Sequence, residues 1–300
     1  MNSVPVVVLS ILTGTWARIY LLRIDYRIYP SYPQGYVIHV MLGAIAAFLG
    51  AVAVPAIISK DYQAATFLAL AATQFREIRT LERETLSNME ATELVPRGKA
   101  YIEGIARVFE ARNYLALLTA LLTSLTAYLT PGATAVKFGC ALIFGALLPV
   151  LIRPVVQGQV IGDVADVEIA PIEFDGPMLI VADVRIMNIG LETVRQVYRK
   201  QGLGVIIKPR NPNATATLAN VGQRQAIAHD AAGQLGIHKD IDEPDYTPLV
   251  RRQISTGCVV MAIVPSEPQP EALLTAVRNV PILEGARKKP LASRAGRLVD

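Results

Sequence analysis

The sequence predicts a membrane α-helical N-terminal half joined to a cytoplasmic C-terminal domain of the α/β or α+β class. Hydrophobic residues make up 52% of the 300 residues and charged residues 18%, with the apolar excess in the first half. Several runs there are uncharged and approach the roughly 20 residues that a helix needs to cross a bilayer. After residue 157, short β-branched runs alternate with helical stretches, which is typical of a mixed domain.

Five apolar segments precede residue 157, and we expect all five to cross the membrane. They comprise residues 4–17, 36–58, 62–75, 113–129 and 133–156. The first and third are only about 14 residues long, a length at which an interfacial or buried helix competes with a span. Whether residues 62–75 cross fully is therefore left open by length alone.

The basic residues favour the five-span topology. With five spans, ten Lys and Arg residues fall in the loops 18–35 and 76–112, whereas Lys60 and Lys137 fall on the opposite side. Basic residues are enriched in cytoplasmic loops. The sequence therefore predicts a multi-pass cell-membrane protein with its N-terminus outside and its C-terminal domain in the cytoplasm.

The predicted spans contain a few polar candidates for function. Thr119, Thr123 and Thr126 form a hydroxyl stripe, which is explained by interhelical hydrogen bonds or by the lining of a pore. His39 is an ionisable group one turn into its span, and such groups are candidates for function. The same span carries small residues that allow another helix to approach closely; these are Gly43, Ala47, Gly50 and Ala51.

The polar stretch between the third and fourth segments, residues 76–112, is predicted to be an amphipathic cytoplasmic hinge within a membrane domain of residues 1–156. A Pro-Arg-Gly sequence at residues 96–98 interrupts the helical period. The helix that follows has an apolar side, formed by Ile102, Ile105, Ala106 and Phe109. Its candidates for coupling or interaction with a partner are Tyr101, Glu103, Arg107 and Glu110. The alternative is a helix that merely lies against the membrane or the C-terminal domain.

Residues 157–286 are predicted to form the cytoplasmic domain, followed by a basic tail at residues 287–300. Buried strands are expected at residues 178–186, 204–207 and 258–264, and an alternating edge strand at 164–172. Helices are expected at residues 191–200, 216–235 and 269–277. From Arg153 onward the chain contains 17 basic and 16 acidic residues, so it lacks the excess of positive charge that is typical of nucleic-acid-binding surfaces.

Motifs for catalysis, cofactors or metals do not stand out in the sequence. It contains no phosphate-binding P-loop, no nucleophile elbow and no HExxH zinc motif. Residues 238–245 gather carboxylates beside a histidine but lack the pattern of a calcium loop, so a solvated turn is expected. Cys140 and Cys258 are far apart and are expected to be reduced and buried. We therefore expect no cofactor and no enzymatic activity.

Residues 101–106 read Tyr-Ile-Glu-Gly-Ile-Ala, and the chain resembles the YIEGIA proteins, an uncharacterised membrane family of endospore-forming bacteria. The blocks DYRIYPSYP at residues 25–33 and GAVAVP at residues 50–55 carry the same resemblance, which extends over essentially the whole chain. It implies a multi-pass membrane protein linked to spore formation. It implies no activity and no site residues.

These observations leave several classes of function open. The first is a non-enzymatic membrane platform that recruits or orients proteins at the cytoplasmic face, in sporulation or spore-envelope assembly. The alternative is a small transporter or channel gated by the cytoplasmic domain, and a third is an enzyme acting on a lipid or a nucleotide-derived signal. The expected partners are the lipid bilayer and cytoplasmic proteins but no nucleic acid, and a homo-oligomer is left open.

Overall fold

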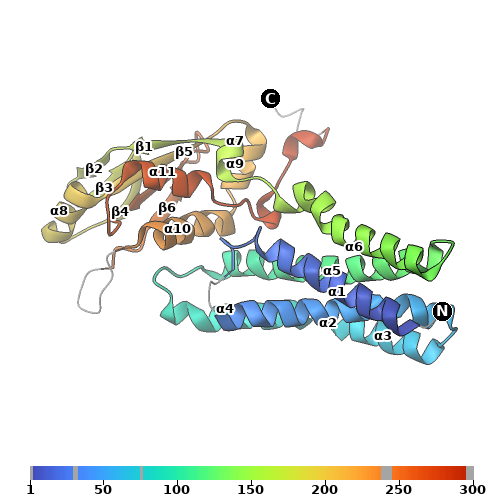
Figure 1. Cartoon of the computed structure of the whole chain (residues 1–300). Helices are drawn as coiled ribbons and strands as arrows, with labels where there is room; N and C mark the ends of the chain where they lie inside the picture. Colours follow the sequence, from blue (N-terminus) through green and yellow to red (C-terminus); the bar gives the residue numbers. More distant parts are fainter. Residues whose placement is uncertain (1–2, 30–32, 75–76, 238–244, 295–300) are drawn as a thin grey trace. The chain divides into compact units, whose positions relative to one another are not determined.

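A computed structural model describes residues 3–29, 33–74, 77–237 and 245–294 (Figure 1). The chain divides into two compact units, which are described separately here. The helical unit comprises Met1–Glu84 and Ile105–Gln157, and the C-terminal unit comprises Thr85–Gly104 and Gly158–Asp300. Residues 85–104 thus belong with the C-terminal unit although more than fifty residues of the helical unit follow them in the chain.

The described residues of the helical unit form six helices, of which α4 and α5 also give residues to the C-terminal unit. They are α1 (Ser3–Leu22), α2 (Pro33–Ile58), α3 (Tyr62–Gln74), α4 (Glu77–Met89), α5 (Lys99–Leu129) and α6 (Thr134–Gln157). The amphipathic helix and the fourth apolar segment expected from the sequence are one continuous helix, α5. Since no proline interrupts residues 99–129, nothing in that stretch breaks the hydrogen-bonded ladder.

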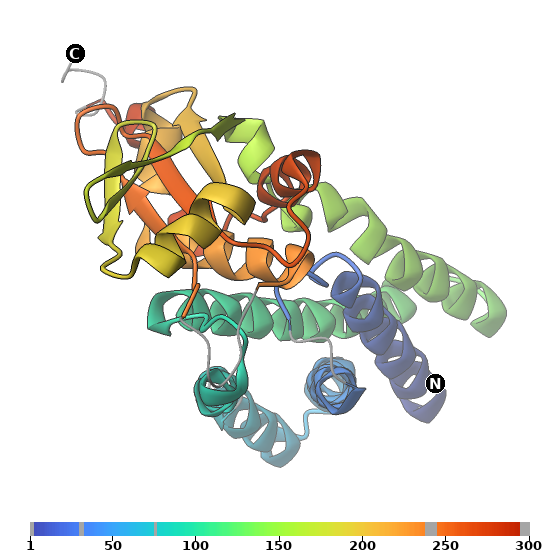
Figure 2. The ribbon, with the colours of Figure 1, turned by 90° about the vertical axis from the view of Figure 1, so that its left-hand side faces the viewer.

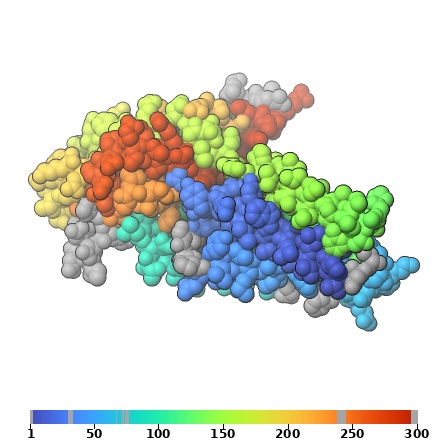
Figure 3. Space-filling model, in the orientation of Figure 1, coloured from blue at the N-terminus to red at the C-terminus, as the bar shows by residue number. Residues whose placement is uncertain are grey.

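Within the part of the chain that the structure describes, three helices are long and apolar enough to cross a membrane, namely Ser3–Leu22, Gln34–Ile58 and Thr134–Gln157. They match the first, second and fifth segments expected from the sequence. The third segment is the shorter helix α3 and the fourth is the second half of α5, so five complete spans stay a prediction. Large apolar side chains cover the outer faces of α1, α2 and α6, as lipid contact requires; examples are Val8, Leu12, Met41, Phe48, Ile143 and Leu151. Figure 3 shows α1 (dark blue) and α6 (green) side by side on one such face.

Small residues bring the backbones of α1, α2 and α5 close together. The sequence predicted such close packing for the face of α2 that carries the small residues. A Cβ atom placed on Gly50 would lie 2.1 Å from the carbonyl oxygen of Leu117 in α5. A Cβ atom on Gly14 of α1 would lie 2.6 Å from Cβ of Ala47. Glycine is therefore required at both positions for the helices to pack at this distance.

We expect Gly50→Ala to destabilise the helical unit by about 1–3 kcal/mol, because the added methyl group overlaps the α5 backbone. The control is Gly139→Ala in α6, where nothing lies within 4 Å of the position that an added Cβ atom would take. That variant should gain up to about 1 kcal/mol of helix propensity. Thermal unfolding in detergent measures both changes, and equal shifts would contradict the close packing of α2 on α5.

The C-terminal unit contains two antiparallel sheets. The larger has the strand order β1 (Ala165–Ala170), β5 (Leu203–Pro209), β7 (Val259–Ile263), β6 (Leu249–Arg252), and the smaller is a meander of β2 (Ile172–Asp175), β3 (Met178–Val181) and β4 (Val184–Asn188). The helices are α7 (Ile161–Val164), α8 (Glu192–Gln201), α9 (Pro212–Leu218), α10 (Val221–Leu235) and α11 (Pro270–Arg278). Short 3₁₀ turns occupy Glu90–Thr92, Glu284–Ala286 and Pro290–Ala292.

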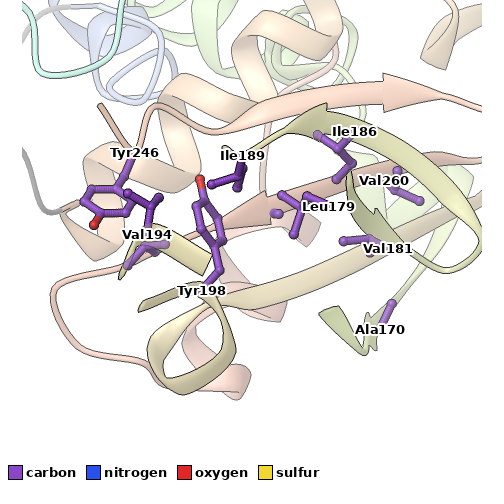
Figure 4. Close-up of a cluster of buried hydrophobic side chains, with 11 residues drawn as sticks. Ala170, Leu179, Val181, Ile186, Ile189, Val194, Tyr198, Tyr246 and Val260 are labelled. Atoms are coloured by element: carbon purple, nitrogen blue, oxygen red, sulfur yellow. The ribbon is translucent and has the colours of Figure 1, made fainter. Parts of the chain in front are cut away.

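Strand β7 lies at the centre of this unit, and all five of its residues are buried. On one face of the larger sheet, Val260 and Ala262 pack against the smaller sheet and α8, in a core that includes Leu179 and Tyr198 (Figure 4). Burial raises the pKa of Tyr198 to about 12, so its hydroxyl stays protonated. Helices α9, α10 and α11 cover the opposite face (Figure 2). The unit therefore has three layers: helices α9, α10 and α11, then the larger sheet, then the smaller sheet together with α8.

Several details differ from the sequence-based expectations. Residues 178–186 form two strands instead of one, because the chain turns at Ala182 and Asp183 with φ angles of 46° and 64°. Two consecutive positive φ angles are the geometry of a tight hairpin, usually signalled by glycine or asparagine. The helix expected at residues 216–235 is interrupted, since the Asn220 side chain accepts a hydrogen bond from the N–H of Gln223 and starts α10.

Strand β1 lies at a sheet edge, as predicted. The prediction that both cysteines are buried is wrong: Cys140 is exposed and Cys258 is half-buried.

Candidate functional site

Five ionisable side chains are buried together in the helical unit, and we call them the polar cluster. They are Arg18 in α1, Asp25 in the following loop, His39 in α2, Glu82 in α4 and Arg112 in α5, and none is more than 8% exposed. Charged side chains are rarely buried to this extent unless they are paired. The cluster therefore marks the part of the helical unit where polar interactions matter most.

Arg18 is held by His39 and by two aromatic rings. Its Nη2 lies 3.0 Å from Nδ1 of His39, and its Nε donates to the carbonyl oxygen of His39 at 3.3 Å. The guanidinium carbon lies 5.7 Å from the ring centre of Tyr29 and 5.1 Å from that of Phe109, within cation–π range. A Cβ atom on Gly43 would lie 2.4 Å from Cγ of Arg18, so glycine at that position makes room for the arginine stem.

These contacts decide the tautomer of His39. An arginine only donates hydrogen bonds, so Nδ1 of His39 must be the acceptor. We therefore assign the hydrogen of the neutral ring to Nε2, which lies 3.6 Å from Oε1 of Glu82. The result is a row of three side chains, Glu82, His39 and Arg18, in which the neutral imidazole separates a carboxylate from a guanidinium.

Arg112 and Asp25 form the second part of the cluster. Nε of Arg112 donates to Oδ2 of Asp25 at 2.7 Å and Nη2 donates to Oδ1 at 3.2 Å, which is the bidentate geometry that arginine favours with carboxylates. Nη2 also donates to the carbonyl oxygen of Val156 near the end of α6 at 3.1 Å. One side chain of α5 thus fastens the loop after α1 and the last turn of α6.

The cluster gathers the ends of helices that are far apart in the sequence. α1 ends near it, α2 begins near it, and α4, α5 and α6 each contribute a contact. Its charges are compensated within the cluster, so the arrangement serves first to fix these ends against one another. Within residues 3–29, 33–74, 77–237 and 245–294, no group of three or more His, Cys, Asp or Glu side chains is arranged to hold a metal ion. Most of the carboxylate-rich stretch at residues 238–245 lies outside the described residues.

The threonine stripe is closed off by other helices. Thr123 is fully buried, and its Oγ1 accepts a hydrogen bond from Oγ1 of Thr13 in α1 at 3.1 Å. All three threonines also donate to carbonyl oxygens one turn earlier in α5. A Cβ atom on Gly145 of α6 would lie 2.3 Å from Oγ1 of Thr123. The hydroxyl groups therefore serve helix packing, and one of the three makes an interhelical hydrogen bond.

The sequence did not single out the other four members of the polar cluster as a site: Arg18 and Arg112 were counted only among the basic loop residues, and Asp25 and Glu82 were not considered as charges. The sequence did contain a sign that Arg112 is buried. It follows Ile105 by seven residues and Phe109 by three, and so falls on the apolar face of its helix. Asp25 carries no such signal, because its partner is 87 residues away. His39 was identified from the sequence, but its two polar neighbours were not.

Comparison with known proteins places the whole chain in one family. The model of the family described as YIEGIA protein matches residues 6–293. The chain belongs to the YIEGIA family. A protein of Bacillus subtilis (strain 168) described as uncharacterized protein YphB is 43% identical over 284 residues, which cover 95% of this chain and 94% of that protein. No solved structure matches. The resemblance inferred from residues 101–106 is confirmed.

The YIEGIA hexapeptide opens α5, and most of its side chains are buried. Tyr101 is 2% exposed, its N–H lies 3.2 Å from Oε1 of Gln225, and its ring centre lies 5.9 Å from that of His229. Burial, together with the charge of Arg97, lowers the pKa of His229, which favours a neutral ring. A side chain at Gly104 would contact Leu283. Residues 101–104 of the hexapeptide therefore belong to the C-terminal unit, whereas Ile105 and Ala106 belong to the helical unit.

The other predicted coupling residues lie on more polar surface. Glu103 is half-buried and Arg107 is exposed. Glu110 is half-buried, and its Oε2 lies 3.6 Å from Nη1 of Arg79 in α4. Tyr101 is thus part of a core, whereas the three charged residues keep access to solvent. A role for them in contacting partners stays a prediction.

Proposed function

We propose that this protein is a five-span membrane platform, not an enzyme, whose C-terminal unit lies in the cytoplasm and recruits or orients partner proteins there. Its cellular setting is sporulation or spore-envelope assembly. The membership in the YIEGIA family, with a Bacillus relative, supports the cellular part. The outward apolar faces of α1, α2 and α6 support the membrane part.

The observation that carries the topology is the pairing of Arg112 with Asp25. Asp25 lies in the loop 18–35 and Arg112 in the stretch 76–112, which are the two basic stretches of the sequence. An ion pair at 2.7 Å requires both to lie on the same side of the bilayer. Glu82 beside His39 places a second residue of 76–112 at the same end of the helices. This supports passage of residues 62–75 across the membrane, which returns the chain to that side.

The transporter alternative gains no specific support. Thr119 and Thr123 are buried and Thr126 is half-buried, and Thr123 packs against α1 and α6, as described above. A cavity of about 240 Å³ in the helical unit is lined by apolar residues of α2, α3 and α5, including Leu49, Ala53, Leu68 and Leu121. Routes for ions and protons through membranes are usually marked by ionisable side chains along the path. A platform therefore fits the helical unit better than a conduit.

Cysteine labelling tests the topology. In a background with Cys140→Ser and Cys258→Ser, single cysteines are placed at two exposed positions, Ala133→Cys in the turn before α6 and Glu267→Cys in the C-terminal unit. We expect a membrane-impermeant thiol reagent to label position 133 in intact cells and position 267 only after lysis. Labelling of position 267 from outside would refute the cytoplasmic assignment. Crosslinking in sporulating cells that captures no reproducible partner would refute the platform.

A further inference from the structure

The C-terminal unit contains a pocket of about 250 Å³ between helix α10 and strand β6. Pro96, from the segment before α5, closes one side of it. α10 contributes Arg224 and Ala228, and the chain leading into β6 contributes Pro248 and Val250. Most of the lining is apolar, and Arg224 is its one charged side chain among the residues that the structure describes. The pocket therefore combines an apolar wall with a cation.

Arg224 does not have the surroundings of a structural arginine. Its Nε is buried and finds no hydrogen-bond acceptor in the described part of the chain. The same is true of Nε of Arg252, which follows Val250 by two residues and so points to the same face of β6. Burial and the positive charges of Arg252 and Arg251 lower the pKa of Arg224. Two half-buried arginines with free Nε donors are thus present: Arg224 lines the pocket, and Arg252, outside the lining, shares the face of β6 with the lining residue Val250.

Several other basic residues of this unit are paired with carboxylates, although Arg287 also has a buried Nε without an acceptor among the described residues. Arg195 and Arg199 both pair with Glu192, Arg210 pairs with Asp166, and Lys208 pairs with Glu168. The contrast matters because a buried donor without an acceptor, beside a like charge, lowers the stability of the fold. An anion placed between Arg224 and Arg252 would satisfy the free Nε donors and remove the repulsion.

We propose that this pocket binds a phosphate-bearing ligand of head-group size, with the phosphate between Arg224 and Arg252 and the remainder against Pro96, Ala228 and Val250. The planar guanidinium group suits phosphate, to which it donates two parallel hydrogen bonds. The volume is below the roughly 300–1,000 Å³ of pockets for drug-sized ligands, which favours a small phosphate ester over a dinucleotide. The ligand is a soluble ester or the head group of an anionic phospholipid. This inference does not rest on the platform role.

The test uses the full chain in nanodiscs of phosphatidylcholine. Inorganic phosphate and glycerol phosphate are titrated in one arm, and phosphatidylglycerol replaces part of the lipid in the other, with the melting temperature of the C-terminal unit as readout. We expect a saturable increase in the wild type. Arg224→Gln or Arg252→Gln should weaken the response about 10- to 100-fold. Arg185→Gln, which removes an exposed charge paired with Asp175, should leave it unchanged.

The variants also separate a binding role from a structural one. Without ligand, Arg224→Gln should raise the melting temperature, because it removes a like-charge contact and a buried free donor. A lower melting temperature with an unchanged phosphate response would overturn the proposal. An equal response of Arg185→Gln and Arg224→Gln would also overturn the proposal, since such a response would reflect ionic strength alone. The absence of any response in both arms would overturn it as well. A response to soluble esters or to phosphatidylglycerol identifies the source of the ligand.

Discussion

Replacing Arg112 with methionine is expected to destabilise the helical unit by about 3–5 kcal/mol, the typical cost of breaking a buried ion pair. Asp25, only 3% exposed, would then keep a buried carboxylate without its bidentate partner. The carbonyl oxygen of Val156 would lose a donor as well. Thermal or chemical unfolding of the purified protein in detergent measures the change.

Two controls define the origin of this effect. The double variant Asp25→Asn with Arg112→Met should recover much of the lost stability, because neither position then carries a buried charge that has lost its partner. Arg185→Met breaks a pair with Asp175 in which both side chains are 70% exposed, and should cost no more than about 1 kcal/mol. If Arg112→Met costs as little as Arg185→Met, the polar cluster does not hold the helix ends together.

The second large effect concerns residues 85–104. We expect a fragment of residues 158–300 alone to unfold at a much lower temperature than the C-terminal unit of the whole chain, or to lack a cooperative transition. It lacks Leu86, Val95, Tyr101 and Ile102, each no more than 3% exposed in the structure. A fully buried side chain of this size typically contributes about 1.5–3 kcal/mol. The fragment also loses the hydrogen bond between Nδ1 of His229 and the carbonyl oxygen of Val95, at 2.7 Å.

A synthetic peptide of residues 85–104 added to the fragment should restore cooperative unfolding. Its binding is driven by the same buried side chains, so the matched control is a peptide with Tyr101→Ser and Ile102→Ser, which should not restore it. Circular dichroism and dye-monitored melting follow both mixtures. A fragment that already melts like the C-terminal unit of the whole chain, and gains nothing from the peptide, would contradict the assignment of residues 85–104 to that unit.

The periodic features of the sequence were sufficient to predict several elements. The apolar runs at residues 36–58 and 133–156 are long, so their length indicated helices able to cross a bilayer, and α2 and α6 are such helices. The alternation at residues 164–172 indicated an edge strand, and β1 is one. These signals are local, because each depends on neighbouring residues along one helix or strand.

The features that were missed depend on partners far away in the chain. The turn at Ala182 and Asp183 carries no glycine, so the surrounding meander holds its backbone and the sequence gives no local sign. From the sequence, residues 85–104 were interpreted as part of a polar hinge. Their neighbours Gln225 and His229 lie more than a hundred residues further along the chain, so no local pattern indicates the contact. Likewise, Arg224 in α10 and Val250 in β6 line one pocket only through the packing of α10 on β6.

The discontinuous C-terminal unit has a consequence for how the chain is made. Tyr101 leaves the ribosome 124 residues before Gln225, its hydrogen-bonding neighbour. At bacterial elongation rates this gap corresponds to about 6 to 25 seconds. During that interval the apolar side chains of residues 85–104 have been synthesised, but most of the domain in which they are buried has not. Residues 105–157 of the helical unit are therefore synthesised before the C-terminal unit can fold around its own early segment.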